Sequence, residues 1–180
     1  ASGDGGYLTT NNKLIYKKIK NLRTHGMNES RDNVKNFGYV SRMDNLQAAI
    51  LNYRLKNLKK NINIRRRNVK FYLNNLNLEK IYFPEEKIEE FNTYHTFVIQ
   101  VKKRDELKKF LKKKGIDTAI HYPVPIHLQT ASKYLNYKVG DFIETESQSK
   151  KILTLPINEY LSKKEILYIC KTINHFYEKV

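Results

Sequence analysis

The chain has 180 residues, of which 40% are hydrophobic, so it is long enough for one ordinary domain with a real core. Its one cysteine, Cys170, excludes an intrachain disulfide and a cysteine-based zinc site, and no apolar run reaches the roughly 18 residues of a membrane-spanning helix. The net charge of +16 is compatible with a nucleic-acid partner, but only 8 of the 34 basic residues are arginine, which favours a solvated lysine surface instead.

In the N-terminal part, the β-prone run 6–10 ends at Asn11-Asn12 and predicts a short strand followed by a turn. A helix is predicted next, because apolar residues recur at helical spacing at Leu14, Ile15, Ile19 and Leu22. The polar stretch 24–36 predicts an exposed loop.

From Asp44 onward, apolar residues continue at helical spacing as far as Leu73 without a proline. This pattern predicts one long helix, either straight or bent, over residues 44–76. Three consecutive arginines, Arg65 to Arg67, lie on this helix and point in three directions, so we expect a solvated face in which one arginine can find a partner.

The rest of the chain, residues 77–180, alternates between the strand pattern and the helix pattern. Residues 93–102 and 116–120 predict strands, separated by a helix that Gly115 ends. Ser162 and Glu165 form a capping box before a clean amphipathic stripe that includes Cys170, which we place in the core. This order predicts a small α/β sandwich with helices over one face of a sheet.

Several residues are candidates for chemistry. The segment Gly3-Asp4-Gly5-Gly6 lacks the spacing of a phosphate-binding motif and by itself predicts a turn. Four histidines lie beside expected strand ends or loops, where an imidazole either serves a ligand or stabilises the fold: His25, His95, His121 and His127. The last two share a segment that two prolines stiffen, and both interpretations stay open for this pair.

Taken in chain order, these fragments resemble the DegT/StrS family of sugar-nucleotide aminotransferases, which depend on pyridoxal phosphate (PLP) and have the aspartate aminotransferase fold of type I. The matching fragments are Gly3-Asp4-Gly5-Gly6, Arg23-Thr24-His25-Gly26, the segment 38–49 from Gly38 to Ala49, Arg65-Arg66-Arg67, Tyr94-His95-Thr96-Phe97, the segment 121–129 from His121 to Gln129, Gly140-Asp141-Phe142 and Leu155-Pro156.

The resemblance implies an α/β chain that forms the C-terminal part of a PLP-dependent transferase fold. It assigns residues 1–43 to the C-terminal edge of the PLP-binding large domain, 44–76 to a long linking helix and 77–180 to the small α/β domain. It also implies a homodimer. The lysine that forms the Schiff base with PLP is expected just upstream of Ala1, so we assign a catalytic role to no lysine of this chain and expect the piece alone to be inactive.

For the ligands, the resemblance implies that Arg42 reaches the sugar nucleotide from the partner subunit, and that His121 and Tyr122 lie near the nucleotide diphosphate. Val40 departs from the family, because asparagine usually stands there and reaches the neighbouring subunit's cofactor phosphate. No metal site is expected.

The implied function is amino transfer, with glutamate as the usual donor and a nucleotide-linked keto-sugar as the acceptor, in the biosynthesis of cell-surface polysaccharide or other glycans. We expect a cytoplasmic protein without nucleic-acid or membrane partners. The alternatives are a truncated or degenerate family member that acts as a binding or dimerisation piece, and a basic nucleic-acid-binding domain.

Overall fold

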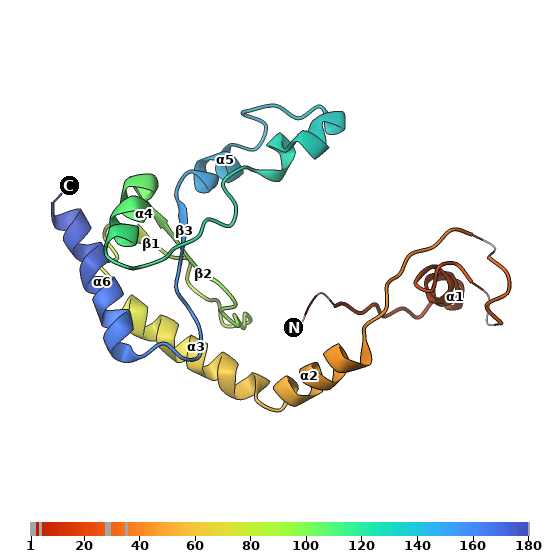
Figure 1. Cartoon of the computed structure of the whole chain (residues 1–180). Coiled ribbons are helices and arrows are strands. Elements are labelled where there is room, and N and C mark those ends of the chain that lie inside the picture. Colours follow the sequence, from red (N-terminus) through yellow and green to blue (C-terminus); the bar gives the residue numbers. More distant parts are fainter. Residues whose placement is uncertain (1–2, 4, 28–29, 35, 180) are drawn as a thin grey trace. The chain divides into compact units, whose positions relative to one another are not determined.

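The computed structural model describes residues 3, 5–27, 30–34 and 36–179, and it divides the chain into two compact units. Unit 1 comprises residues 1–59 and unit 2 comprises residues 60–180 (Figure 1). Each unit is described by itself. Within the described residues, no helix is long and apolar enough to cross a lipid bilayer, and no group of three histidine, cysteine or acidic side chains gathers as metal ligands.

Unit 1 begins with an extended segment and the helix α1, Lys13–Leu22. The predicted helix is confirmed. Asn12 caps it, because the Asn12 side-chain oxygen accepts hydrogen bonds of 2.9 and 3.2 Å from the backbone N–H groups of Leu14 and Ile15. The predicted strand over 6–10 is wrong: this segment is extended but pairs with no other strand of the described chain. Without a ladder partner, β-prone residues do not make a strand.

The long helix predicted over 44–76 is interrupted, since two helices occupy this range: α2, Asn45–Leu55, and α3, Leu58–Leu73. At the break, the backbone N–H of Asn57 donates to the carbonyl of Arg54, three residues earlier, at 3.1 Å. This tight turn interrupts the regular helical ladder. Neither proline nor glycine stands there, so the sequence offered no signal for it.

Unit 2 contains a three-stranded antiparallel sheet of order β1-β2-β3. Its strands are β1, Ile81–Tyr82, β2, Phe97–Val101, and β3, Ile152–Leu155. The strand predicted over 93–102 is confirmed in its second half. The strand predicted over 116–120 is wrong, because only Ala119 pairs there, in a single bridge to Thr154 of β3.

The core of unit 2 lies on one face of this sheet. The strand register places a buried set of side chains on that face: Ile81, Phe97, Ile99, Val101, Leu153 and Leu155. Three helices supply the rest of the core, namely α3, α4 (Arg104–Lys113) and α6 (Lys163–Glu178). The predicted sandwich with helices over one sheet face is therefore confirmed. Cys170 is fully buried in α6, as predicted.

The ends of the helices in unit 2 follow the sequence signals. Gly115 has φ +74°, and the N–H of Ile116 donates to the carbonyl of Leu111 at 2.9 Å, which closes the end of α4. The Ser162–Glu165 capping box begins α6, and the Ser162 donors hold the pKa of Glu165 below its usual range. These local predictions are confirmed.

The arginines of α3 correct another prediction, because two of the three are paired with acidic side chains distant in sequence. Arg65 pairs with Glu159 at 2.9 Å, and Arg66 pairs with Glu86 at 2.6 Å. Only Arg67 is exposed, as expected for a solvated face. Helix α3 therefore holds the loops around residues 86 and 159 in place.

Candidate functional site

Two fragments that are separate in the sequence pair with each other in unit 1. Thr24 and Val40 form an antiparallel bridge, and backbone hydrogen bonds of 2.7 to 3.1 Å connect residues 22–25 with residues 39–41. We call this paired structure the 22–42 ribbon. It fixes the backbone on both sides of His25 and just before Arg42.

Two glycines allow the ribbon to close. Gly26 is buried with φ +76°, and a β-carbon there would overlap the carbonyl oxygen of Asn36. A β-carbon on Gly38 would in turn overlap the backbone of Gly26 and Leu22. Because the obstacles are backbone atoms, no side-chain movement relieves them, and both positions require glycine.

A hollow of about 1220 Å³ lies in unit 1, beside α1 and the ribbon. We call it the basic hollow. Five of its lining side chains are lysine or arginine, and no carboxylate belongs to the described lining, which consists of Tyr16, Lys17, Lys18, Lys20, Asn21, Thr24, His25, Met27, Arg31, Asn36 and Arg42. A concave surface lined by charges of one sign concentrates the electric field, so the basic hollow attracts polyanions.

The donors of the basic hollow divide into two groups. Thr24 and Asn21 are used structurally, since the Thr24 hydroxyl donates to the Lys20 carbonyl at 2.7 Å and the Asn21 amide donates to the Met27 carbonyl at 2.6 Å. In contrast, the charged groups of Arg31 and Arg42 have no partner among the described residues. Guanidinium groups with all donors available suit phosphate oxygens.

The structure places the predicted residue Arg42 in this hollow, and it adds residues that the sequence reasoning missed. Lys17 and Lys18 of α1 and Arg31 of the following loop line the same space. A signal for the two lysines existed, because they lie on the helix that leads directly into the Arg23-Thr24-His25-Gly26 fragment. Arg31 had no comparable signal, since only the folding of the ribbon brings it to α1.

Val40 presents an aliphatic side chain, 69% exposed, at the bridge of the ribbon. Valine has no side-chain donor, so this position does not hold a phosphate as asparagine would. The charge of the basic hollow fits a phosphate group, whereas Val40 does not contribute to binding one.

In unit 2, His121 and Tyr122 directly follow the bridge between Ala119 and β3. The His121 Nδ1 atom lies 2.8 Å from the Thr154 hydroxyl, and the rings of His121 and Tyr122 meet edge to face with centroids 5.4 Å apart. Both side chains are exposed. Because Thr154 engages Nδ1, the Nε2 atom of His121 is the ring nitrogen left for a ligand.

His127 behaves differently from His121. It is buried at the short helix η1, Ile126–Leu128, and its Nε2 atom lies 3.1 Å from Glu146 in α5, Ile143–Ser149. Glu146 also accepts a 2.8 Å hydrogen bond from the Gly140 N–H, and this donor, followed by His127, holds the pKa of Glu146 below its usual range. Of the two histidines left open by the sequence, His127 is therefore structural and only His121 is accessible to a ligand.

The remaining candidate residues lie in different parts of the chain. In the fragment Gly3-Asp4-Gly5-Gly6, Asp4 lies outside the described residues. Ala1, next to which the resemblance places the missing lysine, lies outside them as well. Arg42 belongs to unit 1, and His121 and Tyr122 belong to unit 2, so the structure describes two separate groups of candidate ligand residues.

Comparisons with known proteins show which family the chain resembles. The model of the DegT/DnrJ/EryC1/StrS aminotransferase family matches residues 1–174. The chain is 34% identical over 180 residues to a pleiotropic regulatory protein of Geobacillus stearothermophilus, covering 98% of this chain and 48% of that protein. It is 32% identical over 172 residues to dTDP-3-amino-3,6-dideoxy-alpha-D-galactopyranose transaminase of Aneurinibacillus thermoaerophilus, covering 96% and 47%.

Among solved structures, DesV from S. venezuelae superposes with a TM-score of 0.85 at 30% sequence identity, covering 95% of this chain and 46% of DesV. The chain therefore has an α/β fold that corresponds to about half of a sugar aminotransferase, and it spans about half the length of the curated relatives that it matches. Because the family model covers residues 1–174, this chain belongs to the DegT/DnrJ/EryC1/StrS aminotransferase family.

Proposed function

We propose that the chain is the C-terminal portion of a PLP-dependent aminotransferase that moves an amino group from glutamate to a nucleotide-linked keto-sugar in the biosynthesis of cell-surface polysaccharide or other glycans. The observation that carries this proposal is the basic hollow, which combines the family's Arg42 with four further lysine and arginine side chains and has no carboxylate in its described lining. A diphosphate is the ligand that such a surface favours.

In this proposal, Arg42 binds the diphosphate of the sugar nucleotide through its unpartnered guanidinium group. His121 and Tyr122 contact the same part of the substrate in the assembled enzyme, because both are exposed and Thr154 holds the His121 ring. When bound, PLP supplies the electron sink for amino transfer. The Schiff-base lysine is proposed to lie in the part of the relatives' length that this chain does not cover.

The assignment of residues 1–43 to the large domain, 44–76 to the linking region and 77–180 to the small domain belongs to the same proposal. We also propose that the assembled enzyme is a cytoplasmic homodimer. The dimer is supported by the surface of unit 1: among its described residues only Gly26 is buried, while Leu14, Leu46 and Tyr53 are at least 70% exposed. Such a surface needs a covering partner, which the rest of a large domain and a second subunit would supply.

The proposal is tested by measuring the affinity of the purified chain for dTDP by isothermal titration calorimetry. The variant Arg42→Ala loses a charge-assisted contact and is expected to bind about tenfold more weakly. Arg54→Ala is the matched control, because Arg54 lies on α2 in the same unit and outside the lining of the hollow. Equal affinities for the two variants, or no preference of the wild type for dTDP over thymidine, would contradict the proposal.

A second candidate function is that of a family member without catalysis, which acts as a binding or dimerisation piece. Val40 favours it, because this side chain cannot donate to a cofactor phosphate. The intact mass of the native gene product separates the two candidates. A mass of about 21.4 kDa, that of this chain, supports the binding piece. A mass near twice that value, with PLP attached to a lysine after borohydride reduction, supports the aminotransferase.

A further inference from the structure

Unit 2 contains a second hollow, of about 780 Å³, between α3 and the segment 78–86. We call it the α3 pocket. It shares no residue with the basic hollow or with the His121–Tyr122 pair. Its lining consists of Arg66, Arg67, Val69, Lys70, Leu73, Leu78, Ile81, Tyr82, Phe83, Glu85, Glu86 and Tyr94. A volume of this size lies within the range of about 300 to 1,000 Å³ that is typical of small-molecule sites.

The walls of the α3 pocket are apolar and belong to the core of unit 2. Val69 and Ile81 are 1% and 3% exposed, and Leu73 and Phe83 pack against the same core. The side chains therefore have fixed positions, and a ligand body placed here would meet a preformed apolar surface.

One polar group of the pocket lining has a donor that no described residue uses. Tyr94 is only 6% exposed, yet its hydroxyl forms no hydrogen bond with any described residue. Burial raises the pKa of Tyr94, so the phenol stays protonated at neutral pH and remains a donor. Because this hydroxyl has no acceptor among the described residues, it can donate a hydrogen bond to an acceptor group of a ligand.

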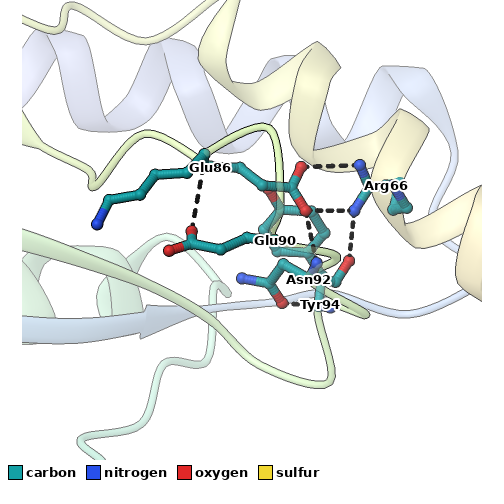
Figure 2. Close-up of polar contacts among 6 residues, drawn as sticks. Arg66, Glu86, Glu90, Asn92 and Tyr94 are labelled. Atoms are coloured by element: carbon teal, nitrogen blue, oxygen red, sulfur yellow. Dashed lines mark hydrogen bonds and ion pairs between the residues drawn. The ribbon is translucent and has the colours of Figure 1, made fainter.

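One wall is fixed by a network around Arg66, which Figure 2 shows beside Tyr94. Arg66 binds both carboxylate oxygens of Glu86, at 2.6 and 2.7 Å, and donates to the Asn92 carbonyl at 2.7 Å. The Arg66 guanidinium also lies 4.5 Å from the centre of the Phe91 ring. Because the charges of Arg66 and Glu86 cancel, this ion pair makes the wall of the pocket rigid and adds no net charge to it.

The remaining charges at the pocket are Arg67 and Lys70, both exposed, and the single carboxylate of Glu85. Neither Arg67 nor Lys70 has a side-chain partner among the described residues. The pocket therefore combines apolar walls, a phenol donor and an excess of positive charge. This combination selects a ligand with an apolar body and a negatively charged end.

We propose that the α3 pocket binds a small apolar carboxylate, whose body contacts Val69, Leu73 and Phe83 and whose charged end meets Tyr94, Arg67 and Lys70. This site lies within unit 2 and goes beyond the proposed aminotransferase function, on which it does not depend.

The probe for this site is 2-naphthoate, titrated into the ¹⁵N-labelled 180-residue chain and followed by amide chemical shifts. We expect saturable shifts in residues 66–83 and at Tyr94. The double variant Arg67→Gln with Lys70→Gln is expected to weaken binding about fivefold, because both cations are exposed and screened by solvent. Tyr94→Phe is expected to weaken it by a similar factor while leaving the amide spectrum dispersed.

The matched control is the double variant Lys109→Gln with Lys113→Gln, which removes the same number of charges from exposed positions on α4. This variant should bind like the wild type. The neutral analogue 2-naphthamide should bind more weakly than 2-naphthoate. Absence of saturable shifts at the pocket, equal binding of the neutral analogue, or equal loss in the α4 control would each overturn the proposal. Because dTDP binding is measured at Arg42, failure of either proposal leaves the other intact.

Discussion

Replacing Gly26 with alanine is expected to open the 22–42 ribbon. Two costs add up at this residue. The left-handed backbone with φ +76° costs an alanine about 1 to 2 kcal/mol, and the new methyl group overlaps the Asn36 carbonyl oxygen. Relief of that overlap requires the backbone segments to separate. Each of the ribbon's hydrogen bonds contributes about 1 kcal/mol, so the substitution removes about 3 kcal/mol or more from local closure.

Hydrogen exchange measured by mass spectrometry resolves this effect along the chain. In Gly26→Ala, peptides from residues 22–42 should exchange about a hundredfold faster or more, while peptides from β2, β3 and α6 keep the wild-type rate. Binding of dTDP should weaken as well, because Arg42 follows the ribbon directly.

Two glycine variants separate the causes. Gly115→Ala meets a similar left-handed φ of +74° but open space, and Gly6→Ala meets neither obstacle. Gly115→Ala should therefore affect only the end of α4 by about 1 kcal/mol, and Gly6→Ala should have no effect. If the amide hydrogens of residues 22–42 exchange at the wild-type rate in Gly26→Ala, closure of the ribbon does not require glycine at this position.

Three further predictions concern unit 2. Tyr72→Phe should lower the free energy of unfolding by about 1 to 2 kcal/mol in urea titrations, because the fully buried Tyr72 hydroxyl donates to the Pro156 carbonyl at 2.9 Å; a change below about 0.5 kcal/mol would contradict this. Arg66 lowers the pKa of Glu86, so the Arg66–Glu86 pair stabilises the fold above the ordinary carboxyl pKa and this stabilisation disappears as the pH falls through the lowered value. Thermal unfolding scans below pH 4.5 should therefore show a steeper loss in the wild type than in Glu86→Gln, and parallel profiles would count against the pair. Burial raises the pKa of Cys170 to about 12, so Ellman's reagent should label it only after urea is added, and rapid labelling of the folded chain would show that this thiol is accessible.

The sequence by itself determined the elements whose signals are local. The signals are Asn12 before α1, Gly115 after α4 and the Ser162–Glu165 box before α6. Each acts within five residues, through hydrogen bonds that form whenever the helix forms. The apolar stripe of α6 and the burial of Cys170 follow from the same helical spacing. The ordered fragments also indicated the family and marked Arg42 as a ligand residue.

Only the tertiary structure decided features that depend on contacts between distant residues. The β-prone segments 6–10 and 116–120 did not become strands, because a strand needs a partner along its whole length and the sequence does not state where that partner lies. Of the three arginines at most one was expected to be paired, yet both Arg65 and Arg66 have acidic partners, which lie 94 and 20 residues away in the sequence.

The basic hollow also depends on contacts between residues that are distant in the sequence. Its charges come from α1, from the loop and from the end of the ribbon, and they gather only because Gly26 and Gly38 let two backbone segments approach each other. Backbone pairing of this kind depends on the absence of a β-carbon at both positions at once. A glycine in a sequence indicates conformational freedom, but which other residue it must approach is set by the three-dimensional fold.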